Sequence, residues 1–371
     1  MALKKCGIVI TSIYDTGWIE RISKNLKESN ENENVTIYFI SDNKTPSTCF
    51  EKIKIAQKKG IKIWAPTMEE QKKFEHQFSI DNFILENSDH RRNIGYLKAY
   101  IDEVDFVISM DDDNFPHGTD FIETHRKMLS ANTVHKLLSS PNNFFNNCTL
   151  LEKNTFIHPR GFPTNKKDQV KVEYKKASIK VGVNAGMWTI APDVDAISWL
   201  IKYQEFNSIN KVDQVILADS TFCPVNSQNT ALIRELIPAY YFVRMNYDIG
   251  GGLKFDRLGD IYSGYFLQKV AKSSGYNISF GMPLVTHERN NHDYLNDANA
   301  EWGCFRTIDI FTEWLTNLKL NNQSVVDNFK CLADELDLFA SISNFRYVAS
   351  STSGFYHQMS FDMKRWIKLF C

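Results

Sequence analysis

The sequence predicts an α/β protein with a central, mostly parallel sheet. Three short apolar stretches, Cys6–Thr11, Val35–Ile40 and Ile61–Trp64, are predicted to be buried strands. A polar loop and a helical segment from Trp18 to about Glu28 separate the first two strands. Strand, loop, helix and strand in this spacing are typical of βαβ units, whose strands run parallel.

An acidic triplet follows the next predicted strand. The apolar run 106–108 is expected to be buried, and Asp111, Asp112 and Asp113 come almost directly after it. Three carboxylates at a strand end repel one another unless a cation or hydrogen-bond donors satisfy them. Oxygen ligands favour Mg2+ or Mn2+, which takes the rest of its shell from water and substrate phosphates. The alternative is a solvated acidic turn in which Asp113 or Asn114 caps a helix.

Length and composition narrow the class of protein. The 371 residues are enough for one large or two medium domains, and the formal net charge is −1. That charge gives no support to a nucleic-acid coat protein, although a local basic groove stays open. No run of about 18 apolar residues occurs, so we expect no membrane span. The polar start is unlike a signal peptide, and the seven cysteines follow no disulfide spacing, so we expect a cytoplasmic protein.

Two further candidates lie at element ends in the first third of the chain. Asp42 directly follows the second predicted strand, and ligands of parallel α/β sheets bind beyond the carboxyl ends of strands. Simple turn chemistry is the alternative for Asp42. Arg92 lies with Arg91 in the first turn of a predicted helix, which is an unfavourable place for cations. Their position favours an anionic partner such as a diphosphate, and pairing with nearby Asp or Glu is the alternative.

The segment 181–196 is rich in small residues. Gly186 and its small neighbours would allow a ligand to approach the backbone closely. Trp188 belongs to the same segment. Pro192 and Asp193 are then predicted to open a helix.

Three more candidates are isolated charged or titratable residues. Arg160 lies in a stiff loop with two prolines and a glycine, where it either serves a function or is a surface residue in a turn. Asp260 begins an apolar helix, for which an N-cap is the structural alternative. His287 ends a predicted strand and is a candidate extra metal ligand, although a lone histidine is usually structural.

Five short motifs follow one another in a particular order. They are Asp-Asp-Asp, Arg-Gly-Phe-Pro, Gly-Met-Trp-Thr-Ile-Ala-Pro-Asp-Val-Asp-Ala, Arg-Leu-Gly-Asp-Ile-Tyr-Ser-Gly and Gly-Met-Pro-Leu-Val-Thr-His. In this order the chain resembles the reversibly glycosylated polypeptide family, whose plant members are UDP-arabinopyranose mutases. The resemblance runs from the first strand to the segment 355–370. It implies a GT-A-like nucleotide-sugar-binding domain over residues 1–295, with a C-terminal helical extension over 296–371 packed on it.

The resemblance also bears on the site residues. It implies Asp111, Asp113 and His287 as ligands of Mn2+ or Mg2+. The residues expected to bind the nucleotide sugar are Asp42, Arg92, Asp112, Gly186, Trp188 and Asp193. Asp260 matches the second acid of a family motif and would orient a sugar hydroxyl or act as a base. Arg160 matches the arginine that the family is said to glycosylate on itself.

Three positions depart from the family pattern. Gly259 replaces the first acid of the family's acid pair, and Lys167 stands where the family has arginine. Both changes count against mutase chemistry. Residues 288–291, Glu-Arg-Asn-Asn, replace a small polar run at a place that bears on the choice of sugar or acceptor.

We therefore expect a metal-dependent glycosyltransferase that uses a nucleotide sugar, with UDP as the expected nucleotide. The acceptor would be a separate molecule: a glycan, a small molecule or a modified nucleic acid. The alternatives are a mutase of the arabinopyranose type with self-glycosylation, and a non-catalytic nucleotide-sugar-binding protein. A nuclease fits the acidic triplet alone but not the Gly/Trp/Pro-Asp segment. A homo-oligomer is compatible with all of these.

Overall fold

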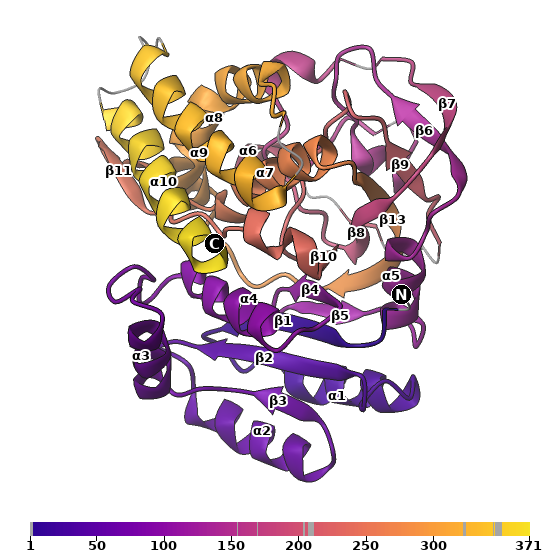
Figure 1. The fold of residues 1–371 in the computed structure, drawn as a ribbon, viewed down its shortest axis with the longest axis vertical. Coiled ribbons are helices and arrows are strands. Elements are labelled where there is room, and N and C mark those ends of the chain that lie inside the picture. Colours follow the sequence, from indigo (N-terminus) through magenta and orange to yellow (C-terminus); the bar gives the residue numbers. More distant parts are fainter. Residues whose placement is uncertain are drawn as a thin grey trace.

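The structure is a computed structural model, and its central feature is an eleven-stranded sheet (Figure 1). It describes residues 3–153, 155–168, 170–202, 205–206, 211–321, 324–343, 345 and 351–371. Along the sheet the strands are β3 (Lys62–Trp64), β2 (Val35–Ser41), β1 (Cys6–Ser12), β4 (Phe106–Met110), β10 (Asn229–Ile233), β8 (Val181–Ile190), β13 (Asn277–His287), β9 (Val215–Leu217), β6 (Val134–Ser139) and β7 (Glu173–Ser178). The short β5 (Asn114–Pro116) pairs with β13 off this path.

Strand direction brings several chain segments to one edge of the sheet. The strands β3, β2, β1 and β4 are parallel, as the sequence predicts. Strand β10 is antiparallel to both β4 and β8, so β8 and its parallel partner β13 run in the same direction as β4. The carboxyl ends of β1, β2, β4, β8 and β13 therefore meet at one edge, together with the beginning of β10. The predicted α/β class with a mostly parallel central sheet is confirmed.

Helices pack around this sheet. Those of the first half are α1 (Trp18–Glu28), α2 (Ser47–Lys58), α3 (Met68–Gln77), α4 (Arg92–Ile101) and α5 (Phe121–Leu129). Those of the second half are α6 (Ala196–Ile201), α7 (Gly259–Ser273), α8 (Tyr294–Asn317), α9 (Val325–Ile342) and α10 (Ser351–Ile367). Figure 1 shows α8, α9 and α10 gathered beside α7, away from β2 and β3. The C-terminal segment is thus helical, as expected, and packs on the sheet-containing part.

Short elements complete the chain. Strands β11 (Tyr247–Gly250) and β12 (Leu253–Phe255) form a separate hairpin. The 3-10 turns are η1 (Asp89–Arg91), η2 (Asn147–Leu150), η3 (Thr164–Lys166), η4 (Arg234–Ala239) and η5 (Lys368–Phe370). Among the described residues, no helix combines the length and apolar character needed to cross a bilayer.

One predicted helix start differs from the structure, and at a second the capping alternative does not hold. Helix α6 begins at Ala196 and not at Asp193, because the side chain of Asp195 accepts from Ser198 N and caps it. Asp193 is thereby left free for a tertiary contact. Helix α7 begins at Gly259, and the side chain of Asp260 does not cap it. Both carboxylates face one arginine instead, as described below.

Candidate active site

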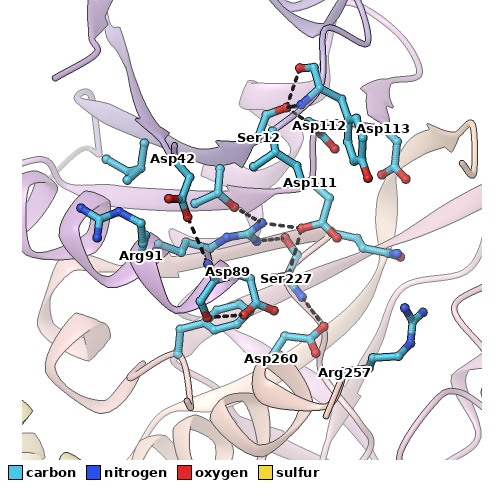
Figure 2. A pocket seen from close by; sticks show the side chains of 18 of the residues that line it. Ser12, Asp42, Asp89, Arg91, Asp111, Asp112, Asp113, Ser227, Arg257 and Asp260 are labelled. Atoms are coloured by element: carbon cyan, nitrogen blue, oxygen red, sulfur yellow. Dashed lines mark hydrogen bonds and ion pairs between the residues drawn. The ribbon is translucent and has the colours of Figure 1, made fainter. Parts of the chain in front are cut away.

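A cleft of about 370 Å3 opens at the carboxyl edge of the sheet. Its lining comes mainly from the loops after β1, β2, β4, β8 and β13, from the segment 87–92 that leads into α4, from the loop of Arg160, from the segment before β10 and from the start of α7. Ligands of α/β sheets bind at such edges, and the size lies within the usual range for small-molecule sites. Figure 2 shows the acidic triplet in this cleft, with Asp42 and Arg257 on opposite sides of Asp111.

The three acids of the triplet have three different partners. Asp111 accepts from Arg92 Nη2 at 2.7 Å and from Ser227 Oγ at 3.0 Å. Asp112 accepts a hydrogen bond from the Ser12 hydroxyl. Asp113 Oδ2 lies 3.5 Å from His287 Nε2. The chain turns after β4 and re-enters the sheet as β5, which pairs with β13 and so places Asp113 beside His287.

The pair Asp113 and His287 fits a divalent metal ion shared with a substrate. Nδ1 of His287 lies 2.7 Å from the Ala191 carbonyl oxygen, which accepts its proton and leaves Nε2 directed at Asp113. Within the described ranges, no group of three or more His, Cys, Asp or Glu side chains is arranged to hold a metal. Mg2+ and Mn2+ need only one or two such ligands when substrate phosphates supply the others.

Asp111 does not join that pair. Its Oδ1 is taken by Arg92, whose side chain is 4% exposed and reaches the triplet from the first turn of α4. Arg92 thus pairs with a nearby aspartate, which was the alternative to an anionic ligand in the sequence analysis. Burial opposes the charge of Arg92, but Asp111 offsets it and raises the pKa of Arg92 further above its usual range. The three expected metal ligands are therefore brought to one cleft, but only two of them face each other.

The other two acids of the triplet, Asp112 and Asp113, have pKa values shifted in opposite directions. Burial, together with the neighbouring carboxylates and despite the Ser12 hydrogen bond, raises the pKa of Asp112 to about 7. Burial would also raise the pKa of Asp113, but the hydrogen bond and charge of His287 outweigh it and hold this pKa below the usual value. Burial opposes the protonation of His287, yet Asp113 outweighs that effect and raises the pKa of His287.

Arg160 lies between two carboxylates at the same edge. Its Nε is 2.9 Å from Asp193 Oδ1 and its Nη2 is 2.8 Å from Asp260 Oδ2, while Nη1 donates to the carbonyl of Arg257. Burial raises the pKa of Asp260 in spite of Arg160, whereas Arg160 overcomes burial at Asp193 and lowers that pKa. Asp260 also accepts from Ser227 N. A sugar on the Arg160 guanidinium would have to displace these partners.

Asp42 lines the cleft, as expected from its place after β2. Its Oδ2 accepts from Ser88 N at 3.0 Å and its Oδ1 from Asn43 N at 2.7 Å. The first contact holds the loop before α4 against the end of β2. Asp42 therefore both stabilises the turn after β2 and lines the cleft.

Gly186 and Trp188 lie outside this cleft. Both border a separate interior void of about 10 Å3, and Trp188 is 3% exposed. A Cβ on Gly186 would come within 2.4 Å of the Pro283 carbonyl oxygen and 2.1 Å of Asn229 Nδ2. Gly186 was predicted to let a ligand approach the backbone. It instead lets the neighbouring strands pack closely, because β8 lies between β10 and β13.

Arg257, Arg289 and His292 are among the cleft residues that were not predicted as site residues. Arg257 opens the Arg-Leu-Gly-Asp motif, and the other two follow the motif that ends at His287. A signal for Arg289 was present in the sequence, since it lies two residues after His287 in the run that departs from the family. The other departures do not reach the cleft in this way: Lys167 lies 3.9 Å from Asp195, outside the lining.

A family model described as reversibly glycosylated polypeptide matches residues 52–371. The chain belongs to this family. UDP-arabinopyranose mutase 1 of Arabidopsis thaliana is 27% identical over 242 residues, which is 63% of this chain and 61% of that protein. UDP-arabinopyranose mutase 1 of Oryza sativa subsp. japonica is 29% identical over 228 residues, 59% of this chain and 56% of that protein. The matched region thus spans less than two thirds of these relatives.

Solved glycosyltransferase structures are also similar. A mannosyltransferase from Pyrobaculum calidifontis in complex with GDP-Man and Mn2+ has a TM-score of 0.41 and 9% identity, covering 99% of this chain and 86% of that one. TarS residues 1–349 of S. aureus in complex with UDP-GlcNAc has a TM-score of 0.38 and 10% identity, covering 98% of this chain and 90% of that one. Likenesses at this level say nothing about substrate.

Proposed function

We propose that this protein is a divalent-metal-dependent enzyme that cleaves the glycosyl bond of a nucleotide sugar, with UDP as the nucleotide, and transfers the sugar to a separate acceptor. The observation that carries the proposal is the pair Asp113 and His287, held beside a cleft at the carboxyl edge of an α/β sheet. Family membership supports a nucleotide-sugar substrate, because the relatives are named as mutases of UDP-arabinopyranose. Mn2+ or Mg2+ is the proposed cofactor.

Cleavage of the anomeric bond leaves negative charge on the diphosphate. A divalent ion at Asp113 and His287 would neutralise part of that charge. Ala191 holds the His287 ring with Nε2 toward the site. Arg92 compensates the charge of Asp111, so that one acid fewer repels the diphosphate. Asp112, whose pKa is raised to about 7, is about half ionised near neutral pH and so adds less negative charge than an ordinary aspartate.

Asp260 is the proposed catalytic residue on the sugar side. Its carboxylate lines the cleft, and its raised pKa makes it a better proton acceptor than an ordinary aspartate. It would orient a sugar hydroxyl or accept the proton of the incoming nucleophile. Arg160 favours the ionised form of this carboxylate and holds it in place through the 2.8 Å contact, and is therefore a positioning residue. A doubly paired guanidinium is a poor nucleophile itself.

The glycine at position 259 supports transfer over ring isomerisation, because the family resemblance places the first acid of an acid pair there. A Cβ at this position would lie 2.6 Å from the carbonyl oxygen of Val243, so the acid that the family carries here could not be accommodated without movement. Of the motif's two acids only Asp260 is present here, and Gly259 itself does not line the cleft. The second candidate remains a mutase, in which another hydroxyl of the same sugar is the nucleophile, and the names of the relatives favour it.

The test is product analysis without an acceptor. Purified protein is incubated with Mn2+ and a panel of UDP-sugars, and products are separated by chromatography and identified by mass spectrometry. Slow release of UDP and free sugar, absent in an Asp112→Asn, Asp113→Asn double variant, is the result expected for a transferase. A ring isomer would identify the mutase instead. Absence of metal-dependent turnover of every UDP-sugar would contradict the proposal and leave a UDP-sugar-binding protein as the reading.

A further inference from the structure

One side of the cleft is formed by three basic side chains, Arg257, Arg289 and His292, which we term the basic wall. Arg257 precedes α7, and the other two lie between β13 and α8. The Arg257 carbonyl accepts from Arg160 Nη1, so the wall adjoins the Arg160–Asp260 pair. Arg257 has a left-handed backbone with φ 65°, a conformation that residues other than glycine keep mainly where tertiary contacts enforce it.

Carboxylates behind the wall hold these side chains in position. Asp297 of α8 lies 3.0 Å from Arg257 Nη1, 2.9 Å from His292 Nδ1 and 3.9 Å from Arg289 Nη2. Glu301, one helical turn later, lies 3.3 Å from Arg257 Nε. Neither acid lines the cleft, and the Glu301 side chain is 1% exposed. The acids therefore lie behind the basic groups, which face the cleft.

Arg289 is preorganised and incompletely satisfied. Its guanidinium lies 4.6 Å from the ring centre of Trp199 and 5.3 Å from that of Tyr294. Its Nε is buried and has no hydrogen-bond partner in the described part of the chain. A buried N–H without an acceptor is unfavourable, so a ligand that supplies an acceptor there is favoured. Stacking fixes the plane of the guanidinium, which suits bidentate contact with a carboxylate or phosphate.

Two of the other cleft arginines are not available in this way, and a third, Arg91 on the Asp42 side (Figure 2), is paired with Glu75 outside the lining. Arg92 is paired with Asp111, and Arg160 with Asp193 and Asp260, and all three of these acids themselves line the cleft. Arg257 and Arg289 have their carboxylate partners behind them instead. The side of the cleft nearest Asp260 therefore presents cationic donors to a ligand, opposite the Asp42 side in Figure 2.

We propose that the basic wall is a second anion-binding site, separate from the diphosphate position, which selects a substrate with a carboxylate or phosphate at the sugar end of the cleft. The inference rests on the proposed function, since the sugar end is defined by Asp260. Two sources fit this chemistry. The anion belongs either to the transferred sugar, as in a uronic acid, or to the acceptor, as in a sugar phosphate.

Calorimetry with Mn2+ present tests the proposal and separates the two sources. In the first arm, the full-length protein is titrated with UDP, UDP-glucose and UDP-glucuronate. In the second arm, the protein is saturated with UDP and titrated with glucose and glucose 6-phosphate. The variants are Arg289→Gln and Arg257→Gln, each checked for folding by circular dichroism. Arg21→Gln is the matched control, because Arg21 pairs with Glu288 next to the wall but does not line the cleft.

The expected result is a preference of roughly 10-fold or more for the anionic compound in one arm, as charge-assisted bidentate contacts provide. Arg289→Gln and Arg257→Gln should each remove most of that preference while UDP affinity changes by less than about 2-fold, and Arg21→Gln should keep it. No preference in either arm would overturn this inference but not the proposed function. The same holds if the wall variants lose as much affinity for UDP as for the anionic compound. Failure of the unmutated protein to bind UDP would overturn the proposed function as well.

Discussion

Nη2 of Arg160 lies 2.8 Å from Oδ2 of Asp260, and both side chains are at least 90% buried. The same guanidinium contacts Asp193, so one cation neutralises two acids that come from the loop after β8 and the start of α7. This arrangement joins two parts of the chain and defines the sugar side of the cleft.

Removing the guanidinium should destabilise the protein strongly. Arg160→Met leaves Asp193 and Asp260 buried without a countercharge, and breaking a buried pair from one side costs about 3–5 kcal/mol. Denaturant unfolding monitored by fluorescence measures the loss. Arg21→Met is the control, because its ion pair with Glu288 is 46% exposed on both sides and should cost about 1 kcal/mol or less. Equal losses in the two variants would contradict the structural role given to Arg160.

Two acids of the triplet should differ in what they do. Asp111→Asn removes the charged partner of the buried Arg92 and should lower the free energy of unfolding by about 1–3 kcal/mol, because Asp111 is 29% exposed and the amide keeps one acceptor. Asp113→Asn should instead weaken Mn2+ binding at least about 10-fold, because Asp113 faces His287. Unfolding curves and Mn2+ titrations of both variants check this division. A larger loss of Mn2+ affinity in Asp111→Asn than in Asp113→Asn would contradict this division and indicate that Asp111 binds the metal ion.

Mn2+ affinity should fall as the pH decreases below about 7. Asp112, whose pKa is raised to about 7, takes up its proton over this range, and the raised pKa of His287 lets its proton compete with the metal ion at a higher pH than that of an ordinary histidine. A metal ion must displace the His287 proton, and protonation of Asp112 removes negative charge beside it, so each proton weakens binding by up to about 10-fold per pH unit. Titrations between pH 5.5 and 8.5 measure the slope. The slope should be shallower in His287→Gln, and a pH-independent affinity in the unmutated protein would contradict the assignment.

Gly186→Ala should affect stability and not ligand binding. The added methyl group would meet the Pro283 carbonyl oxygen and Asn229, which should cost about 1–3 kcal/mol or more. The affinity for UDP should stay within about 2-fold, because Gly186 lies outside the cleft. Gly60→Ala is the control: no atom lies within 4 Å of its Cβ, so only its left-handed backbone costs energy, about 1–2 kcal/mol. A selective loss of UDP affinity in Gly186→Ala would restore the role predicted from sequence.

The elements that the sequence predicted well are those with local signals. Apolar runs mark β1, β2 and β4, and acids at strand ends mark the edge where ligands bind. His287 and Asp113 were expected at one site because each ends or follows a strand, and parallel strands end at a common edge. Strand direction explains why both residues lie at one edge, and the pairing of β5 with β13 then brings Asp113 beside His287.

The sequence could not reveal which partner each charged residue takes. Asp111 and Asp113 are nearly adjacent, yet one faces an arginine from α4 and the other a histidine from β13. Asp193 follows a proline and looked like a helix start, but Asp195 caps α6 and Asp193 meets Arg160. Pairing across the fold decides these contacts, and a local pattern does not encode it. The basic wall was missed for the same reason, because its acids lie on α8.

The binding of UDP with and without Mn2+ tests the central claim most directly. Calorimetry on the unmutated protein, Asp113→Asn and His287→Gln should show UDP binding at least about 10-fold tighter in Mn2+ than in chelator, with that gain lost in both variants. Weak metal-free binding should persist in all three proteins. UDP binding that is independent of Mn2+, or a metal-dependent gain that survives both substitutions, would contradict a nucleotide-sugar site organised around Asp113 and His287.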